Sequence, residues 1–280
     1  MLLLTAASRA SAAGNYAVWL DGSLTDGGNA IPSRLTSLGF TVTLVTTAQL
    51  ETVGFLSTFD AIAVSRYDAS FGTFMTATAA ANVSAYVGSG AGQGGVAVFT
   101  NDMADNLFGS TSGDPFDANL DTLFVNAATF AAASHHGFIG EFNGAVMAMS
   151  SNSASAPALG LLPGSANAVH SYGPLFTYGV GPIGAGNPID AGVTFPFTDS
   201  DSSTYLTDIT GALPGNIVDI YTSSGIVGEP AVLANSYVIH GGDGGLTPVP
   251  EPSTYGLCGS LALAGLALYR RVRRNVAQAA

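Results

Sequence analysis

The sequence predicts an α/β domain built on a doubly wound, mostly parallel sheet. Short runs that are apolar throughout alternate with longer segments of helical periodicity along the first hundred residues. The hydrophobic content of 47% is enough for an extensive core. Strands that are apolar at every position indicate a sheet covered by helices on both faces, which is the arrangement that right-handed crossovers produce.

Between residues 15 and 105 the alternation is regular and predicts a flavodoxin-like order of elements. The first helix is expected to be capped by Asn29, to carry Pro32 in its first turn and to end at Gly39. The expected strands are residues 16–20, 41–45, 60–65 and 95–100, and the expected helices are residues 29–39, 48–57 and 73–87.

The second half of the chain has a weaker pattern, because Gly and Pro interrupt most of its apolar runs. Long surface loops are therefore expected there. No linker is evident before residue 241, so residues 13–240 are expected to form one globular domain, followed by a Gly/Pro stalk at 241–250. Further helices are predicted over 115–128 and 138–149, and further strands near 176–180, 193–197, 217–221 and 231–240.

Charged residues are scarce and unevenly placed. The chain has no Lys, and between residues 14 and 249 two arginines, Arg34 and Arg66, face eighteen Asp and Glu, a net charge of −16. Such a surface repels nucleic acid phosphates and anionic lipid, so no nucleic acid partner is expected. It suits cations, neutral glycans or solubility outside the cell.

The single cysteine, Cys258, lies in the C-terminal apolar run. A disulfide within the chain is therefore excluded, and the globular body has no thiol nucleophile. The N-terminal residues 1–12 are expected to be a signal peptide, because Ala10-Ser11-Ala12 matches a small-residue cleavage site. Its apolar stretch is short and a basic start is missing, so its true start is expected upstream of Met1. The alternative is an unstructured N-terminus.

The C-terminus has three parts in a fixed order, which are a proline-rich motif at 249–254, an apolar run at 255–269 and an arginine cluster at 270–274. The prolines of the first part keep the chain extended and accessible. The apolar run at 255–269 is expected to form a single transmembrane helix, although its fifteen residues span only about 22 Å of a bilayer core of about 30 Å. The positive-inside rule keeps the last part in the cytoplasm. The first part is Val249, Pro250, Glu251, Pro252, Ser253 and Thr254, and the last contains Arg270, Arg271, Arg273 and Arg274.

This tail, at 249–274, resembles the PEP-CTERM sorting domain. The resemblance implies export by the Sec machinery in a Gram-negative bacterium and transient anchoring in the inner membrane. It further implies cutting near the motif by an exosortase, with the product at the cell surface or in the extracellular matrix. Bacteria with such proteins often make exopolysaccharide, which is a further partner. The alternative is a plain C-terminal anchor on a proline stalk.

The body resembles the class I glutamine amidotransferase-like superfamily and its ThuA-like branch. The resemblance rests on the strand that leads into Asp21-Gly22, on residues 61–65 and on Gly94-Gly95-Val96-Ala97-Val98. Residues 186–193 look like an "HPI…G" segment with Asn187 in the His place. The superfamily's Cys nucleophile is missing, since the strand that ends at Thr100 leads into Asn101-Asp102.

Four polar residues at the predicted carboxyl ends of strands are candidates for ligand binding, because such ends line the crevice of doubly wound sheets. Arg66 could clamp a carboxylate or sugar hydroxyls. The alternative is that it forms an ion pair with Asp60 or Asp68. The four candidates are Asp21, Arg66, Asn101 and Asp102.

Two further clusters are candidates for catalysis or for metal binding. His135, His136 and Glu141 could meet if a loop led into a helix, and the alternative is a surface His pair at a helix N-terminus. Closely spaced carboxylates could bind Ca²⁺, the only cofactor considered, or could form a solvated turn. These carboxylates belong to Asp199, Asp201 and Asp208.

Two functions stay open at this stage. The first is a non-enzymatic surface protein that uses the sheet domain for binding or for matrix structure. The second is a carbohydrate-acting hydrolase on a ThuA-like scaffold. The hydrolase requires His135 or His136, Glu141 and the strand-end acids to converge within about 3–5 Å.

Overall fold

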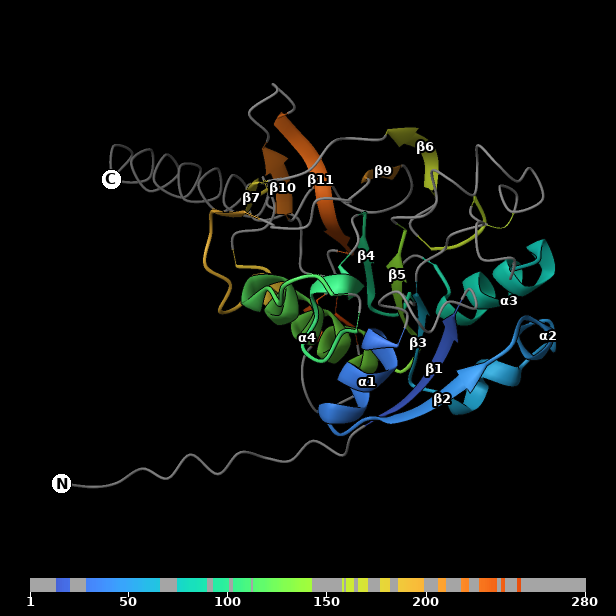
Figure 1. Ribbon diagram of the computed structural model, residues 1–280. Coiled ribbons are helices and arrows are strands. Elements are labelled where there is room, and N and C mark those ends of the chain that lie inside the picture. Colours follow the sequence, from blue (N-terminus) through green and yellow to red (C-terminus); the bar gives the residue numbers. More distant parts are fainter. Residues whose placement is uncertain are drawn as a thin grey trace, which may run out of the picture.

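The fold is described from the computed structural model of the chain (Figure 1). The structure describes residues 14–20, 29–65, 75–89, 93–100, 103–111, 113–142, 158, 160–163, 166–170, 177–181, 186–198, 206–209, 218–221, 227–235, 238–239 and 246–247.

A nine-stranded mixed sheet forms the centre of the molecule, in the order β2-β1-β3-β5-β4-β11-β10-β7-β8. The first five strands in this order are parallel, and from β4 onward each neighbouring pair is antiparallel. The strands are β1 (Asn15–Leu20), β2 (Thr41–Val45), β3 (Ala61–Ser65), β4 (Val96–Phe99), β5 (Gly137–Glu141), β7 (Thr177–Val180), β8 (Phe197–Thr198), β10 (Val218–Tyr221) and β11 (Val227–Ala234).

Helices cover both faces of the parallel half. In Figure 1, α1 and α4 lie together on one side of these strands, and α2 and α3 lie on the other; the two apolar cores divide in the same way. Right-handed crossovers explain this division, because β1→β2 and β4→β5 cross the sheet in one direction, whereas β2→β3 and β3→β4 cross it in the other. The helices are α1 (Ala30–Ser37), α2 (Thr47–Leu50), α3 (Ala77–Val87) and α4 (Ala118–Ala133), with 3₁₀ helices η1 (Phe55–Thr58), η4 (Ala104–Asn106) and η5 (Pro188–Asp190).

The predicted α/β class is confirmed, but the strand order differs from the flavodoxin-like order 2-1-3-4-5. Here β5 lies between β3 and β4, so the order is 2-1-3-5-4. Two small ladders complete the described strands, one of β6 (Ala166–His170) with β9 (Leu206–Ile209) and one of β12 (Val238–Ile239) with β13 (Leu246–Thr247).

The central strands are apolar because both of their faces are buried. Tyr16, Ala17 and Val18 of β1 have no exposed surface, and Trp19 has 1%. Strands β4 and β5 are buried at every position. Full burial of a large apolar side chain stabilises the fold by about 1.5–3 kcal/mol, so these strands supply much of the stability.

The helix predicted over 138–149 is wrong, because residues Gly137–Glu141 form the central strand β5. The physical reason is close packing beneath α4. A Cβ atom on Gly137 would lie 2.1 Å from the carbonyl oxygen of Ala131 in that helix. Only a glycine permits this approach, and the preceding α4 extends to Ala133, beyond its predicted end at 128.

Three smaller expectations are also corrected. The helix predicted over 48–57 is divided into α2 and η1 by Gly54, whose φ is +78°. Asn29 precedes α1, but its side chain does not cap the helix and instead accepts a hydrogen bond from Thr111. The strand predicted over 193–197 is reduced to Phe197–Thr198, and residues 246–247 of the predicted stalk form β13.

Among the described residues, no helix is long and apolar enough to cross a membrane. The predicted signal peptide at 1–12 and the predicted span at 255–269 lie outside the described residues.

Candidate functional site

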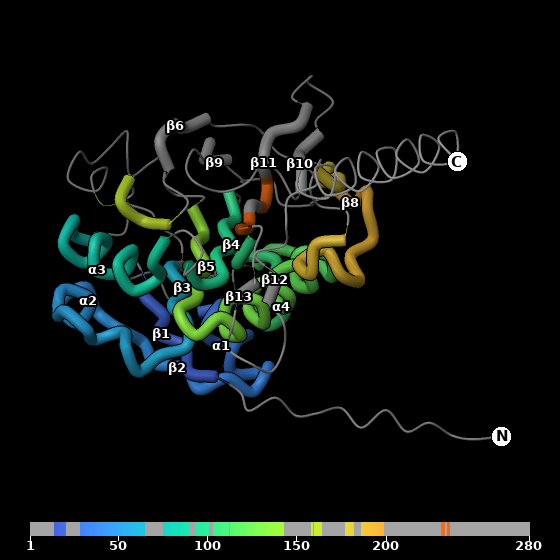
Figure 2. Tube along the Cα trace, turned by 180° about the vertical axis from the view of Figure 1, so that it is seen from behind, coloured from blue at the N-terminus to red at the C-terminus, as the bar shows by residue number. Residues whose placement is uncertain are grey.

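Four parallel strands end side by side at one edge of the sheet. Figure 2 shows β1, β3, β5 and β4 following one another across the molecule. Their last residues are level, because Leu20 pairs with Ser65 and Phe99 pairs with Glu141. The loops that follow these strands therefore leave the sheet at the same edge, where doubly wound sheets bind ligands. We call this the carboxyl edge.

The four predicted ligand residues, Asp21, Arg66, Asn101 and Asp102, lie outside the described residues. Asp199 and Asp201 do so as well, and of the three candidate calcium ligands the structure describes only the backbone of Asp208, in β9 opposite Ala168 of β6. Within the part of the chain that the structure describes, no group of three His, Cys, Asp or Glu could hold a metal ion.

Glu141 is the last residue of β5 and is fully buried at the carboxyl edge. Its Oε1 atom accepts a hydrogen bond of 2.8 Å from the backbone N–H of Ala104, the first residue of η4. The contact satisfies a backbone donor at the start of that short helix. Glu141 therefore ties the chain that follows β4 to the end of β5.

The two histidines lie at the opposite edge of the sheet, before β5 begins. His135 has a φ of 58° immediately after the Ser134 cap of α4, which is the left-handed position where helices commonly end. Its Nδ1 atom lies 2.8 Å from Oδ1 of Asp60. The ring of His136 makes an edge-on contact with Tyr86 at 5.1 Å between centroids.

The structure therefore does not bring His135 or His136 together with Glu141. The five residues from His136 to Glu141 rise by about 16 Å because they are extended in a strand. The expected helix N-terminus at this place is likewise replaced by the C-terminus of α4. Asp60, the alternative partner of Arg66, is paired with His135, and Arg66 lies outside the described residues.

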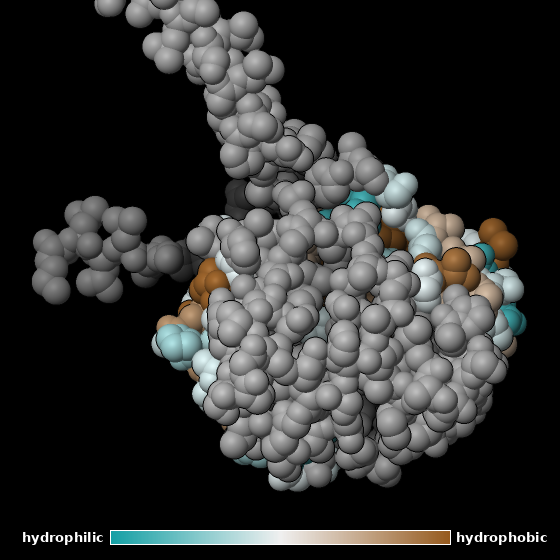
Figure 3. All heavy atoms as spheres, turned by 90° about the horizontal axis from the view of Figure 1, so that it is seen from above, coloured by the Kyte–Doolittle hydropathy of each residue, from teal (hydrophilic) through white to brown (hydrophobic). Residues whose placement is uncertain are grey.

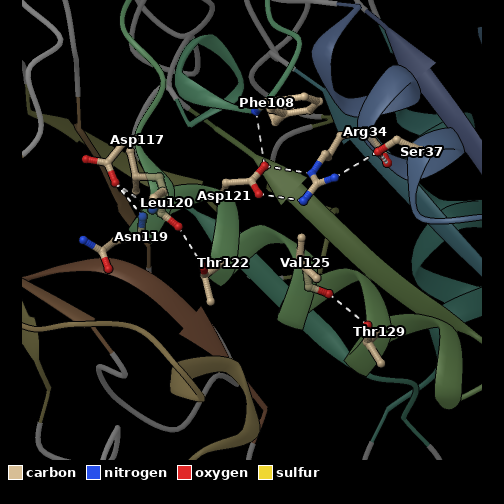
Figure 4. A network of polar contacts seen from close by, with 11 residues as sticks. Arg34, Ser37, Phe108, Asp117, Asn119, Leu120, Asp121, Thr122, Val125 and Thr129 are labelled. Carbon is tan, nitrogen blue, oxygen red and sulfur yellow. Dashed lines mark hydrogen bonds and ion pairs between the residues drawn. The ribbon is translucent and has the colours of Figure 1, made fainter. Parts of the chain in front are cut away.

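An ion pair that the sequence analysis missed lies near the carboxyl edge (Figure 4). Arg34 of α1 donates from Nε and Nη2 to the two carboxylate oxygens of Asp121 in α4, at 2.8 and 2.7 Å. Their side chains are only 17% and 10% exposed. Oδ1 of Asp121 also accepts a hydrogen bond from the backbone of Phe108, whose ring centroid lies 5.7 Å from Cζ of Arg34. The scarcity of cations pointed to Arg34 as much as to Arg66.

The segment between η4 and α4 is fixed to its surroundings by several contacts. The side-chain amide of Asn106 donates to the backbone carbonyl of Pro115. The backbone carbonyl of Asn106 accepts a hydrogen bond from the backbone N–H of Asp117. Asp117 in turn caps α4, because its Oδ1 atom accepts from the backbone N–H groups of Asn119 and Leu120. The segment therefore has a defined conformation at the carboxyl edge.

Asp190 is an unusual carboxylate, in η5. Both of its carboxyl oxygens are buried and have no hydrogen-bond partner in the described structure. Burial raises the pKa of Asp190 to about 7. The backbone around it is held against α4, because the Asn126 amide donates to the carbonyls of Ile189 and Ala191, each at 2.8 Å.

Stability should therefore fall as the pH rises from about 4 to about 7. The folded-state pKa of Asp190 is above the unfolded value of about 3.9, so the folded state binds the proton more tightly in this window, and the stabilisation is lost as the pH passes the folded pKa. Since the residue is partly exposed, we expect about 1–2 kcal/mol from this group.

The variant Asp190→Asn should remove this part of the pH dependence. Thermal melts of the full chain at pH 5 and pH 8 would show it. The melting temperature of the variant, relative to wild type, should rise by about 1–5 °C between the two pH values. Parallel profiles for the two proteins would contradict a buried, protonated Asp190.

Comparison with known proteins gives one match. Residues 248–274 match the family model described as the PEP-CTERM protein-sorting motif. The chain thus carries a C-terminal sorting signal. That signal is of the PEP-CTERM type, as the resemblance of residues 249–274 predicted. No curated protein and no solved structure matches the chain, so the resemblance of the body to glutamine amidotransferase-like and ThuA-like proteins has no support from these comparisons.

Proposed function

We propose that this chain is an exported surface protein sorted by an exosortase, with a body that binds or structures material outside the cell. The observation that carries the proposal is the sorting-motif match at 248–274. The leader at 1–12 directs the chain to the Sec machinery, and the apolar run at 255–269 anchors it in the inner membrane of a Gram-negative bacterium until the exosortase cuts near the motif.

A non-catalytic body is supported by the use of its described polar groups. Glu141 binds the backbone of η4, and Asp121 binds Arg34 and the backbone of Phe108. The histidines are at the opposite edge of the sheet from Glu141, and the globular part of the sequence has no cysteine. The contacts that the structure shows for these side chains therefore hold the fold together.

In this proposal the loops of the carboxyl edge bind a polar, mostly neutral ligand such as an exopolysaccharide. The strands that precede them end level with one another, so the loops start close together. Asp and Asn side chains exchange hydrogen bonds with hydroxyl groups, and an Arg fixes the register of the ligand. The residues proposed for this role are Asp21, Arg66, Asn101 and Asp102.

Sorting is tested by removing the positive end of the tail. Changing Arg270, Arg271, Arg273 and Arg274 together to Ser should leave the C-terminus free to cross the membrane and should block processing. Fractionation and immunoblotting in the host should show an uncut precursor, as should a strain without its exosortase. The matched control changes the same four residues to Lys, which keeps the charge and should be processed normally. If the Ser variant is cut and released like wild type, the proposed sorting is wrong.

A further inference from the structure

Two exposed aromatic rings lie together on the segment between η4 and α4. Phe108 and Phe116 are 61% and 53% exposed. Their centroids are 6.0 Å apart and their planes are almost perpendicular, at 85°. We call them the aromatic pair. On the face of the molecule seen in Figure 3, the described apolar residues appear as a few brown spots.

The aromatic pair is held firmly from below. The backbone N–H of Phe108 donates to Asp121, and the guanidinium of Arg34 lies beside the Phe108 ring. Figure 4 shows this ring projecting beyond the Arg34–Asp121 ion pair. On the other side, the Asn106 amide binds the carbonyl of Pro115, directly before Phe116. A ligand would therefore bind two side chains that the fold already holds in place, so that little conformational entropy is lost on binding.

Packing within the domain does not account for the rings, since more than half of each remains exposed. Burial of these rings on a partner would contribute favourably, as exposed apolar groups held in place commonly mark binding sites. The perpendicular arrangement presents the face of one ring next to the edge of the other, which forms an apolar corner.

Charge and neighbouring groups select the partner. The body carries −16, which repels anionic polymers and anionic lipid. Close to the rings in sequence or by contact are the neutral groups of Ser110, Thr111 and Asn29, the last two joined by a hydrogen bond, and the carboxylate of Asp114, two residues before Phe116. A neutral sugar unit with equatorial hydroxyls matches both the negative charge of the body and the polar groups near the rings. Its flat C–H face is weakly positive and suits the weakly negative face of an aromatic ring, and its rim is polar.

We propose that Phe108 and Phe116 form a binding subsite for a neutral polysaccharide of β-linked glucose-type units. This inference rests on the proposed function, since export is what brings the chain to extracellular polysaccharide. The rings stack on the C–H faces of the sugar, and the neighbouring hydroxyl and amide groups bind its rim. The Arg34–Asp121 ion pair positions the rings and does not touch the ligand.

The test is affinity electrophoresis of the full chain in neutral detergent, in native gels that contain a defined polymer. The probes are hydroxyethylcellulose and laminarin as β-glucans, and alginate as an anionic polymer. Wild type should be retarded by at least one β-glucan and not by alginate. Phe108→Ala and Phe116→Ala should each weaken the apparent affinity by about tenfold, and the double variant should lose retardation.

The matched control is Leu44→Ala, since Leu44 on β2 is also 53% exposed but lies on another element. It should be retarded like wild type, and melting temperatures should show that all variants fold. No retardation of wild type by either β-glucan, or equal retardation of the double variant, overturns the proposal. A change in oligomer size with the double variant, without a change in retardation, assigns the rings to self-association instead. Processing of the tail is scored separately, so failure of sorting and failure of glucan binding are distinguishable.

Discussion

Replacing Gly137 by Ala should strongly destabilise the domain. The new Cβ atom would lie 2.1 Å from the carbonyl oxygen of Ala131, 2.4 Å from its carbonyl carbon and 2.7 Å from its Cα atom. All three are backbone atoms of α4, so no side-chain rotation can relieve the contact. The sheet and the helix must separate along β5.

We expect a loss of about 3 kcal/mol, at the upper end of the usual cost of overpacking. For a domain of this size that corresponds to a melting temperature lower by about 6–12 °C. Circular dichroism melts of the full chain would measure it. If the variant does not fold at all, the direction of the prediction stands, because total stability is only about 5–15 kcal/mol.

Gly54→Ala provides the matched control. Gly54 also takes a side chain poorly, since its φ is +78°, but no atom lies within 4 Å of the added methyl group. Its cost is therefore limited to the left-handed backbone, about 1–2 kcal/mol. A Gly137 variant as stable as the Gly54 variant would mean that α4 does not pack on β5 as closely as described.

The parallel half of the fold could be predicted because local pattern and tertiary burial agree there. Strands β1, β3 and β4 are apolar along their central positions, since helices cover both faces, and each was expected within a residue of its observed bounds. Strand β5 was missed for the opposite reason. Its Gly137 and Gly140 weaken any strand pattern in the sequence. Gly137 is required by the close approach of α4, and Gly140 by the rings of Phe138 and Phe142, two residues away on either side.

The antiparallel half could be predicted only as separate strands. β7 and β10 were expected near their observed positions, but their place in the sheet depends on pairing between distant segments. Val232 of β11 pairs with Phe99 of β4, 133 positions earlier, and the β10–β11 ladder contains two register shifts. No local signal in the sequence specifies such pairing, because register is set by which faces become buried.

The site was harder to predict than the fold. His135, His136 and Glu141 are close in the sequence, and a strand between them takes them to opposite edges of the sheet. Arg34 and Asp121 are 87 positions apart, and only the shared face of α1 and α4 brings them together. Proximity in sequence is therefore a poor guide where an extended segment intervenes.

Replacing Arg34 by Ala should cost about 2–3 kcal/mol, or roughly 4–12 °C in melting temperature. The substitution leaves the Asp121 carboxylate, which is only 10% exposed, without its paired cation. It also removes the support beside the Phe108 ring. A bond between charged groups contributes about 1.5–3 kcal/mol, and this ion pair contains two such bonds in a partly buried setting.

A double-mutant cycle separates the pair from the individual side chains. Arg34→Met and Asp121→Leu should each destabilise alone, whereas the two changes together should cost less than the sum of these single changes, because no buried charge is left unpaired. Ser37→Ala is the control for local disturbance of α1. It removes two exposed bonds, the one from Nη1 of Arg34 to the serine hydroxyl and the one that this hydroxyl donates to the backbone carbonyl of Arg34, so it should change stability by less than about 0.5 kcal/mol. Additive costs for Arg34 and Asp121 in urea melts would show that the two side chains act independently, and the aromatic pair would then have to be held by the backbone contacts of Asn106.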